Sequence, residues 1–381
     1  MIPKDRRIIK KVREIAIRDL RSNYGDLGIY AGPKNFREYW ARDGFFASLG
    51  ACCLKDFEIV RKNLDLFIKY QKANGQIPLR VEEKNHSLSL IGIKVAYKHP
   101  RPVYNSSQVW AGEAMDPTIL FVIAACFYIN SSGDRGWFLK NEKSLLRALD
   151  WILARKKERG LIIEGQKANW ADMAFKSGNV TYTNVCFWKA LTDFSKIRPR
   201  YQIEAENLKK AINTKLWSNQ KGYYVDWIGR SGHIYDDFFV DGNLLAVAWG
   251  LAGPSKFKAI YSFIVKNHLD AIPVIPCFPR LPWLTDIFIR VVSPFYHTKN
   301  IFAWWGPWEI LGKLTIGDAS GARKDFLSLS TVIVKNATFV EVFNQKGIPA
   351  DVLWYKVERK IAWGAGVFLY AASQLEKEGI I

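Results

Sequence analysis

Cysteine, histidine and methionine are scarce in this sequence, with five, five and three of them among 381 residues. The cysteine count is odd and the spacings do not repeat, so they predict neither a disulfide framework nor a zinc site. Cys52, Cys126 and Cys186 lie in apolar stretches, where a buried free thiol is the simplest interpretation. The cysteines therefore fit a reducing compartment and a protein without a metal site.

Long apolar runs are missing as well. The longest, residues 119–129, is too short to cross a bilayer, which needs roughly 20 residues. The first residues, Met-Ile-Pro-Lys-Asp-Arg-Arg, lack the apolar core of a signal peptide. We therefore expect a cytoplasmic protein with no membrane partner.

Acidic residues are outnumbered, with 36 Asp and Glu against 55 Lys and Arg, and the net charge is +19. Such a balance is compatible with an anionic partner, including nucleic acid, a membrane surface or an acidic polysaccharide. The basic residues are spread along the chain, however, and no nucleic-acid motif accompanies the densest group, between Arg6 and Arg13. We expect a solvated basic surface and no nucleic-acid partner. The sequence sets no oligomeric state.

Aromatic residues are abundant: 15 Trp, 16 Tyr and 23 Phe. Aromatic side chains dominate the energetics of protein cores, and Trp rings also form flat platforms on which sugar rings stack. Composition alone favours their use in the core.

Helical periodicity recurs from end to end. Some segments are amphipathic, such as 56–73 with Phe57, Val60 and Leu64 on one face, whereas others, such as 118–129, are apolar nearly all round and should be buried on all sides. Strand-like runs are short and are interpreted as ribbons within loops. The predicted helices span residues 4–23, 43–54, 56–73, 117–130, 139–156, 183–197, 200–217, 241–252, 255–268, 303–315, 319–336 and 362–377.

The two kinds of helix alternate approximately along the chain. Six helical hairpins that close into a ring, with the apolar helices inside, would satisfy this pattern, so we predict an all-α fold, an (α/α)6 toroid, with residues 1–381 as a single catalytic domain. A short-repeat solenoid is the second choice. In a toroid, the loops that precede the inner helices meet at one mouth, where they can carry chemistry on a rigid frame.

Polar and aromatic clusters do precede the apolar helices. Capping alone places some Asp and Asn at helix starts, and for Asp116 and Asp241 this is at least as good an explanation as a site. The clusters, in chain order, are Tyr39-Trp40-Ala41-Arg42-Asp43, Asp116, Trp170-Ala171-Asp172 with Asn184, Asp236-Asp237 with Asp241, Trp304-Trp305, and Glu341.

Asp172 and Glu341 are the candidate catalytic pair. Glycoside hydrolysis needs two carboxyl groups on either side of a sugar ring, one to protonate the leaving oxygen and one to attack or to activate water. Asp172, beside Trp170, stands where desolvation could keep a carboxyl protonated near neutral pH. A single loop carboxylate is more often solvated than catalytic, but these two precede the sixth and the twelfth predicted helices, which lie on opposite sides of the ring.

The ordered set of clusters resembles the six-hairpin glycosidases: glucoamylases, glycogen-debranching amylo-α-1,6-glucosidases, processing α-glucosidase I and neutral invertases. Tyr39-Trp40-Ala41-Arg42-Asp43 is similar to their Trp-x-Arg-Asp segment. Trp170-Ala171-Asp172, followed by Asn184, resembles the general-acid segment. Glu341-Val342-Phe343-Asn344, followed by Ala362-Trp363-Gly364, resembles the base segment and the closing helix.

This resemblance implies an inverting, exo-acting glycoside hydrolase, an α-glucosidase, with Asp172 as general acid and Glu341 as general base. Arg42 and Asp43 would hold hydroxyl groups of the terminal sugar. The only partner implied is a carbohydrate substrate, and no metal or organic cofactor is required. The candidate substrate-binding residues are Tyr39, Trp40, Arg42, Asp43, Asp116, Trp170, Asn184, Asp241, Trp304, Trp305 and Trp363.

Three alternatives stay open: an invertase-like β-fructosidase, a lyase or unsaturated-uronate hydrolase that acts on an acidic glycan, and a non-catalytic sugar-binding toroid. A lyase would use Tyr, His or Arg to abstract a proton, and of the five histidines His297 lies near a predicted site loop. The long loops 76–115 and 269–302 are predicted to form ordered lids over the aglycone side.

Overall fold

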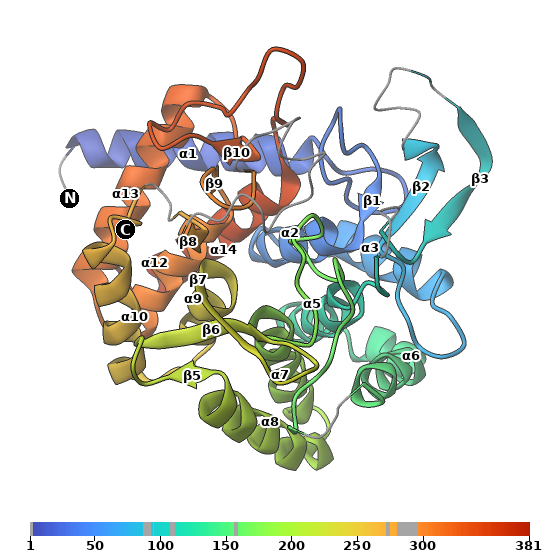
Figure 1. The fold of residues 1–381 in the computed structure, drawn as a ribbon. Helices are drawn as coiled ribbons and strands as arrows, with labels where there is room; N and C mark the ends of the chain where they lie inside the picture. The colour runs from blue at the N-terminus through green and yellow to red at the C-terminus, as the bar shows by residue number, and fades with distance from the viewer. Residues whose placement is uncertain are drawn as a thin grey trace.

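The computed structural model describes residues 3–86, 93, 95–106, 111–155, 159–271, 275–279 and 296–381. Its helices form two concentric layers (Figure 1). Each inner helix contacts the next one along the chain, and α14 contacts α2, so the inner ring is closed. The inner helices are α2 (Ala41–Cys53), α5 (Asp116–Ser132), α7 (Thr181–Ser195), α9 (Val240–Ala248), α12 (Trp305–Thr315) and α14 (Ala362–Lys377).

The outer helices alternate with the inner ones along the chain. Among the contacts between the layers are α2 with α3, α5 with α6, α7 with α8, α12 with α13, and α1 with α14. The predicted all-α (α/α)6 toroid is therefore confirmed. The outer helices are α1 (Pro3–Arg21), α3 (Phe57–Lys69), α6 (Arg135–Leu153), α8 (Gln202–Lys215), α10 (Pro254–Lys266) and α13 (Ala319–Asn336).

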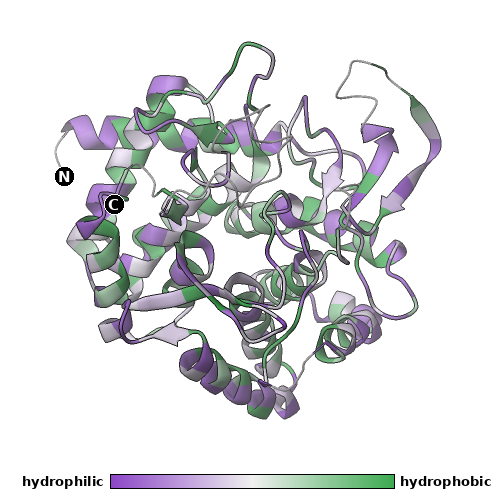
Figure 2. Cartoon of the chain, viewed as in Figure 1, coloured by the Kyte–Doolittle hydropathy of each residue, from purple (hydrophilic) through white to green (hydrophobic). Residues whose placement is uncertain are grey.

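Burial explains why the two kinds of helix take these places. Every residue of α2 from Ala41 to Cys52 is buried, whereas α3 buries one stripe that includes Val60, Leu64 and Phe67. Figure 2 shows the same contrast as apolar inner helices and mixed, polar-faced outer ones. Because removal of apolar surface from water is the main favourable term in folding, the all-apolar helices occupy the ring interior.

The closest approach in the ring is between α2 and α14. A Cβ added at Gly366 would lie 2.5 Å from the Cα of Ala47, and one added at Gly50 would overlap the Gly366 carbonyl. Only glycine lets the two backbones meet at this distance. These two glycines therefore allow the first and last inner helices to close the ring.

Helix boundaries differ from the predicted ones where local hydrogen bonds decide them. The helix predicted to begin at residue 139 begins at Arg135, because the side chain of Asp134 caps it by accepting a bond from the Trp137 amide at 2.9 Å. The segment predicted as 200–217 starts as a 3-10 turn (Pro199–Tyr201) before α8.

Short antiparallel strands lie in the loops between the helices, as the sequence predicted. One sheet has the order β1-β2-β3, β9 pairs with β10, and a third sheet has the order β4-β6-β7-β8 with β5 beside β6. The strands are β1 (Tyr39–Trp40), β2 (Arg80–Lys84), β3 (Ala96–Val103), β4 (Asn179–Val180), β5 (Trp217–Ser218), β6 (Tyr223–Ile228), β7 (Ile234–Phe239), β8 (Cys277–Phe278), β9 (Ile301–Phe302) and β10 (Val342–Phe343).

Other expectations from the sequence have mixed outcomes. All five cysteines are free thiols; Cys52, Cys126 and Cys186 are buried, as predicted, and Cys277 is buried as well. The predicted lids 76–115 and 269–302 lie partly outside the described residues. Among the residues that are described, no helix combines the length and apolar character needed to cross a membrane.

Candidate active site

A narrow pocket of about 80 Å³ lies where the loops before several inner helices meet. Its lining residues come from the start of α2, the loop before α7, the segment before β9, the position just before β10, and α14, which are far apart in sequence. The lining residues are Phe36, Trp40, Arg42, Asp43, Trp170, Asp172, Tyr296, His297, Phe302, Glu341, Ile361 and Trp363.

The two candidate catalytic carboxyls both line this pocket. Burial raises the pKa of Asp172 to about 6, against the opposing effect of the Arg42 guanidinium. Burial also raises the pKa of Glu341 to about 7, while a hydrogen bond from Tyr296 favours its ionised form. Both groups therefore titrate close to neutrality in the free protein, in the range that general acid–base catalysis uses.

Glu341 is held from two sides. The hydroxyl of Tyr296 donates to its Oε1, and the backbone amide of Glu358 donates to its Oε2 at 3.2 Å. The Glu341 amide in turn donates to the Glu358 carbonyl at 2.9 Å. With both oxygens engaged and only 4% of its surface exposed, the carboxylate has a fixed orientation in the pocket.

Arg42 is fixed by a buried ion pair. Its Nε donates to Oδ2 of Asp116 at 2.7 Å, and the two side chains are 6% and 0% exposed. This pair joins the start of α2 to the start of α5 and holds the guanidinium beside the pocket. Burial raises the pKa of the neighbouring Asp43 to about 7 despite the charge on Arg42.

Several buried polar atoms around the pocket have no hydrogen-bond partner among the described residues. Four of them belong to lining residues: Trp40 Nε1, Arg42 Nη2, His297 Nδ1 and Trp363 Nε1. Most buried polar groups in proteins are satisfied, so a cluster of exceptions needs an explanation. Ring nitrogens of Trp304 and Trp305, behind the pocket wall, also lack partners, so the unpartnered groups extend from the lining into the surrounding core.

The aromatic residues are arranged in two tiers. Trp170 and Trp363 line the pocket, whereas Trp304 and Trp305 are completely buried behind them. Trp304 stacks on Trp363 with ring centroids 4.4 Å apart, and Trp305 meets Trp170 edge to face at 5.3 Å. The structure thus places Trp304 and Trp305 as a support for the pocket wall.

Four other predicted site residues also lie outside the lining, and one of them is Asp116, the buried partner of Arg42. Tyr39 is buried and stacks on Tyr30 at 4.3 Å. Asn184 ties its own helix to the preceding loop through the backbone of Ile162. Asp241, at the start of α9, accepts a bond from Trp170 Nε1 at 2.8 Å and so orients a wall of the pocket. Asp236 and Asp237 lie on β7 and are not in the lining.

The acid-bearing loop, defined here as residues 164–178, is braced at both ends. Asn169 Nδ2 donates to Oε1 of Glu164 at 2.6 Å, and Asn169 Oδ1 accepts a bond from the Ala171 amide at 3.0 Å. At the other end, the buried Lys176 pairs with Asp226 at 2.7 Å. Asp172 lies between these two anchors.

Sequence reasoning missed Tyr296, Phe36, Phe302 and Ile361 as lining residues, and it missed the Glu164–Asn169 brace. Tyr296 lies 45 positions from Glu341, so no local spacing connects the two. Glu164 and Asn169 are separated by only five positions, but they lie outside any regular element whose periodicity could place them on one face.

Comparisons with known proteins agree with this architecture. A rhamnosidase from Klebsiella oxytoca superposes with a TM-score of 0.69 at 16% identity, over 95% of this chain and 63% of its own. A mannosylglycerate hydrolase from Thermus thermophilus gives 0.72 at 14% identity, over 94% and 99%. A further structure described as a glycosidase gives 0.68 at 13% identity, over 98% of both chains. This chain has the six-hairpin glycosidase fold.

The sequence comparisons are less informative. No protein-family model matches the chain. An N,N'-diacetylchitobiose phosphorylase from Vibrio furnissii is 23% identical over 210 residues, which are 49% of this chain and 26% of that protein. The chain therefore spans about a quarter of the length of this curated relative. The similarity to known glycosidases is therefore supported by the superposed structures more than by the sequence comparisons.

Proposed function

We propose that this chain is an inverting, exo-acting glycoside hydrolase, an α-glucosidase, with the toroid as one catalytic domain. The observation that carries the proposal is the convergence of Asp172 and Glu341 on one narrow pocket. They come from the third and sixth inner segments of the ring, and aromatic walls surround them. Structures with this fold include hydrolases that act on glycosidic bonds, by their names a rhamnosidase and a mannosylglycerate hydrolase.

In the proposed mechanism, Asp172 protonates the leaving oxygen. Asp172 is only partly buried in the free protein, and a sugar placed against it would complete its desolvation and raise its pKa further above about 6. Glu341 acts as the base that activates water, and the hydrogen bond from Tyr296 favours the ionised form that a base needs.

Arg42, Asp43 and Trp363 would bind the terminal sugar. All three line the pocket: the guanidinium of Arg42 can donate to hydroxyl oxygens, Asp43 can accept from hydroxyl groups, and the ring of Trp363 offers a face to the sugar. A narrow pocket that admits one chain end accounts for exo action.

The lyase alternative is disfavoured by the same pocket. Burial lowers the pKa of His297 to about 3 and raises the pKa of Tyr296 well above its ordinary value. A base with so low a pKa abstracts protons poorly, and so does a hydroxyl that resists ionisation. The invertase-like β-fructosidase requires the same two carboxyls, so only the substrate distinguishes it.

Phosphorolysis, suggested by the name of the phosphorylase relative, is disfavoured by Glu341. A phosphorylase needs room for a phosphate anion at the position of the attacking water. The buried carboxylate of Glu341, when ionised, would repel that anion.

The test is a substrate screen with purified protein on maltose, isomaltose, kojibiose, nigerose, trehalose, sucrose and limit dextrin. The anomeric proton signal of the first product is followed by NMR, with and without phosphate. We expect hydrolysis with inversion. Asp172→Asn and Glu341→Gln should each lower kcat by at least about 100-fold, whereas Asp237→Asn, a carboxyl outside the pocket, should leave it unchanged.

An α-glucosyl fluoride separates the two roles, because fluoride leaves without protonation by an acid. On this substrate Asp172→Asn should recover most of the wild-type rate and Glu341→Gln should not. Full activity of both variants on every substrate would overturn the site assignment. Release of a sugar phosphate instead of free sugar would overturn hydrolysis.

A further inference from the structure

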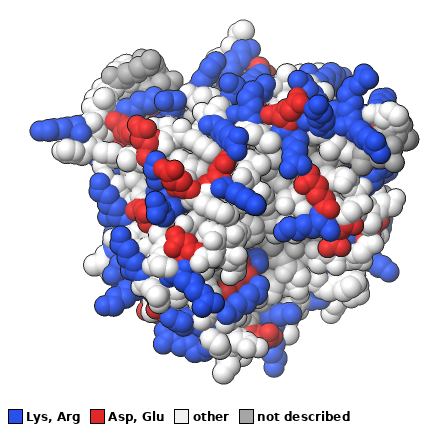
Figure 3. Space-filling model, turned by 180° about the vertical axis from the view of Figure 1, so that it is seen from behind, with Lys and Arg blue, Asp and Glu red and all other residues white. Residues whose placement is uncertain are grey.

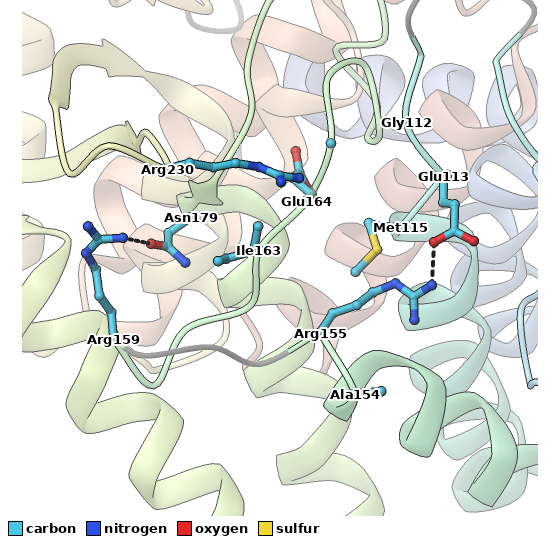
Figure 4. A pocket seen from close by; sticks show the side chains of 11 residues that line it. Gly112, Glu113, Met115, Ala154, Arg155, Arg159, Ile163, Glu164, Asn179 and Arg230 are labelled. Carbon is cyan, nitrogen blue, oxygen red and sulfur yellow. Dashed lines mark hydrogen bonds and ion pairs between the residues drawn. The ribbon is translucent and has the colours of Figure 1, made fainter.

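A second and much larger pocket, of about 760 Å³, is lined in part by Glu164 and Gly165, at the start of the acid-bearing loop. It is bounded by the end of α6, the segment 159–165, the strand β4 and the turn between β6 and β7 (Figure 4). Among the described residues it shares no lining residue with the catalytic pocket, and backbone hydrogen bonds from Gly112 to Gln166 at 2.7 Å and from Met115 to Ala168 at 2.7 Å join its wall to the acid-bearing loop. It is therefore a separate cavity.

Three arginines from three different segments line this pocket: Arg155, Arg159 and Arg230. In Figure 4 the Arg230 side chain extends over the pocket toward Glu164, and Arg159 and Arg155 stand on opposite sides. On the face shown in Figure 3, by contrast, acidic groups lie among many of the lysines and arginines. Three guanidinium side chains therefore lie around one pocket.

The carboxyls in the lining do not neutralise all three arginines. Glu113 pairs with Arg155. Glu164 is 2% exposed and bonds Asn169 and Thr183, and its burial raises the pKa to about 8, so it is largely uncharged at pH 7. No ion pair joins Arg159 or Arg230 to a carboxylate in the described part of the chain.

Arg159 is nevertheless held in place. Its Nη1 donates to Oδ1 of the buried Asn179 at 3.2 Å, and its Nη2 lies against Gly232, on the same turn that carries Arg230. Asn179 is itself fixed by a bond to the Ile162 carbonyl at 3.1 Å. The turn between β6 and β7 thus brings Arg230 to the same pocket as Arg159; the Arg159 guanidinium is preorganised, and the Arg230 side chain extends across the pocket toward Glu164.

We propose that this pocket binds a small anionic carbohydrate through its phosphate or carboxylate, held by Arg159 and Arg230. Guanidinium groups match the geometry of both oxyanions by donating two parallel hydrogen bonds. The carbon body of the ligand would lie on Ile163 and Met115. The volume is within the range of roughly 300–1,000 Å³ that small-molecule sites occupy.

Calorimetric titration tests the proposal with four probes: glucose 6-phosphate, glucuronate, inorganic phosphate and glucose. At least one of the two anionic sugars should bind with a Kd about tenfold or more below that of glucose, which corresponds to 1.4 kcal/mol. Comparison with inorganic phosphate shows whether the sugar body contributes. Because the readout is binding, the result does not depend on glycosidase activity.

Matched variants locate the site. Arg159→Gln and Arg230→Gln should each weaken anion binding about tenfold, whereas Arg200→Gln, which removes a charge at the 3-10 turn before α8, should not. Glu113→Gln should tighten binding, since it frees Arg155. Arg230 is exposed, so its variant should fold even if Arg159→Gln does not, and melting temperatures check this.

Absence of binding by every anion would overturn the proposal, and so would equal affinity for glucose and its phosphate. Binding that survives both arginine variants but disappears in Trp363→Ala would place the ligand in the catalytic pocket instead and would also overturn it. Tighter binding of inorganic phosphate than of either sugar would reject the carbohydrate ligand.

Discussion

Individual carboxyls in this molecule depart from their ordinary behaviour because the ring buries them. Asp172 and Glu341 have pKa values near 6 and 7, and Glu164 near 8, each raised mainly by burial. A raised pKa at a functional pocket is what acid–base chemistry at neutral pH requires, and a raised pKa elsewhere links folding stability to pH.

The first prediction concerns the pH dependence of kcat/KM. Glu341 must be ionised and Asp172 protonated. Because the pKa of this base, about 7, lies above that of the acid, about 6, a minority of the free protein carries the active combination, and that minority is largest between the two values. The profile should be a bell whose two limbs lie near pH 6 and pH 7 and belong to the coupled pair. With glucosyl fluoride, Asp172→Asn should lose the alkaline limb. Persistence of that limb would show that another group sets it.

The second prediction concerns Glu164 and stability. A carboxyl whose folded pKa is raised from about 4.5 to about 8 binds a proton in the folded state only, so stability decreases as pH increases between these values. The urea unfolding free energy of wild type should fall between pH 5 and pH 8 more steeply than that of Glu164→Gln. Glutamine keeps the bonds to Asn169 and Thr183, so equal slopes would mean that Glu164 is ionised in the folded protein.

At the scale of elements, the acid-bearing loop shows how hydrogen bonds can fix the position of a segment that is neither helix nor strand. Asn169 bridges the buried Glu164 and the backbone amide just before Asp172, and Lys176 ties the other end to Asp226. Side chains held by supporting hydrogen bonds keep a reacting group within the small tolerance that catalysis demands.

The third prediction follows from this brace. Asn169→Ala should lower kcat about tenfold on natural glycosides, with little change in KM, because Asp172 loses its orientation and the sugar-binding groups do not. On glucosyl fluoride the same variant should be nearly as active as wild type. An equal loss on both substrates would indicate general damage to the pocket rather than a role in positioning the acid.

The elements were predictable from sequence, and many of the contacts between them were not. Alternation of amphipathic and all-apolar helices predicted the ring, because burial on all sides leaves few places for α5 or α14. The same alternation put Asp172 and Glu341 at one mouth. It could not show that Tyr296 donates to Glu341 or that Trp304 lies behind Trp363, since those facts depend on side-chain packing between segments distant in sequence.

At the scale of the whole molecule, stability depends on the closure of the inner ring. Each inner helix is covered by two neighbours, so the ring has no uncovered end as long as α14 contacts α2. Gly50 and Gly366 permit that contact. Well-packed interiors accept added atoms poorly, because neighbouring groups have no free space into which to move.

The fourth prediction tests this closure. Gly366→Ala should lower the free energy of unfolding by about 1–3 kcal/mol through overpacking, measured by urea denaturation. Gly136→Ala is the control: it also lies in a helix, its added Cβ would have only one neighbour, at 3.6 Å, and alanine should raise stability slightly. If the two variants were equally stable, α2 and α14 would have room to separate.

The contact between α2 and α14 also has a consequence for synthesis. During translation α2 leaves the ribosome long before α14. The apolar face around Phe46 and Ala47 therefore lacks its partner helix while most of the chain is translated. Contacts between such distant segments form late and slowly. A ribosome that stalls after Asp172 and before Glu341 therefore holds a nascent chain in which the acid has been synthesised, the base has not, and the apolar face of α2 lacks its partner α14.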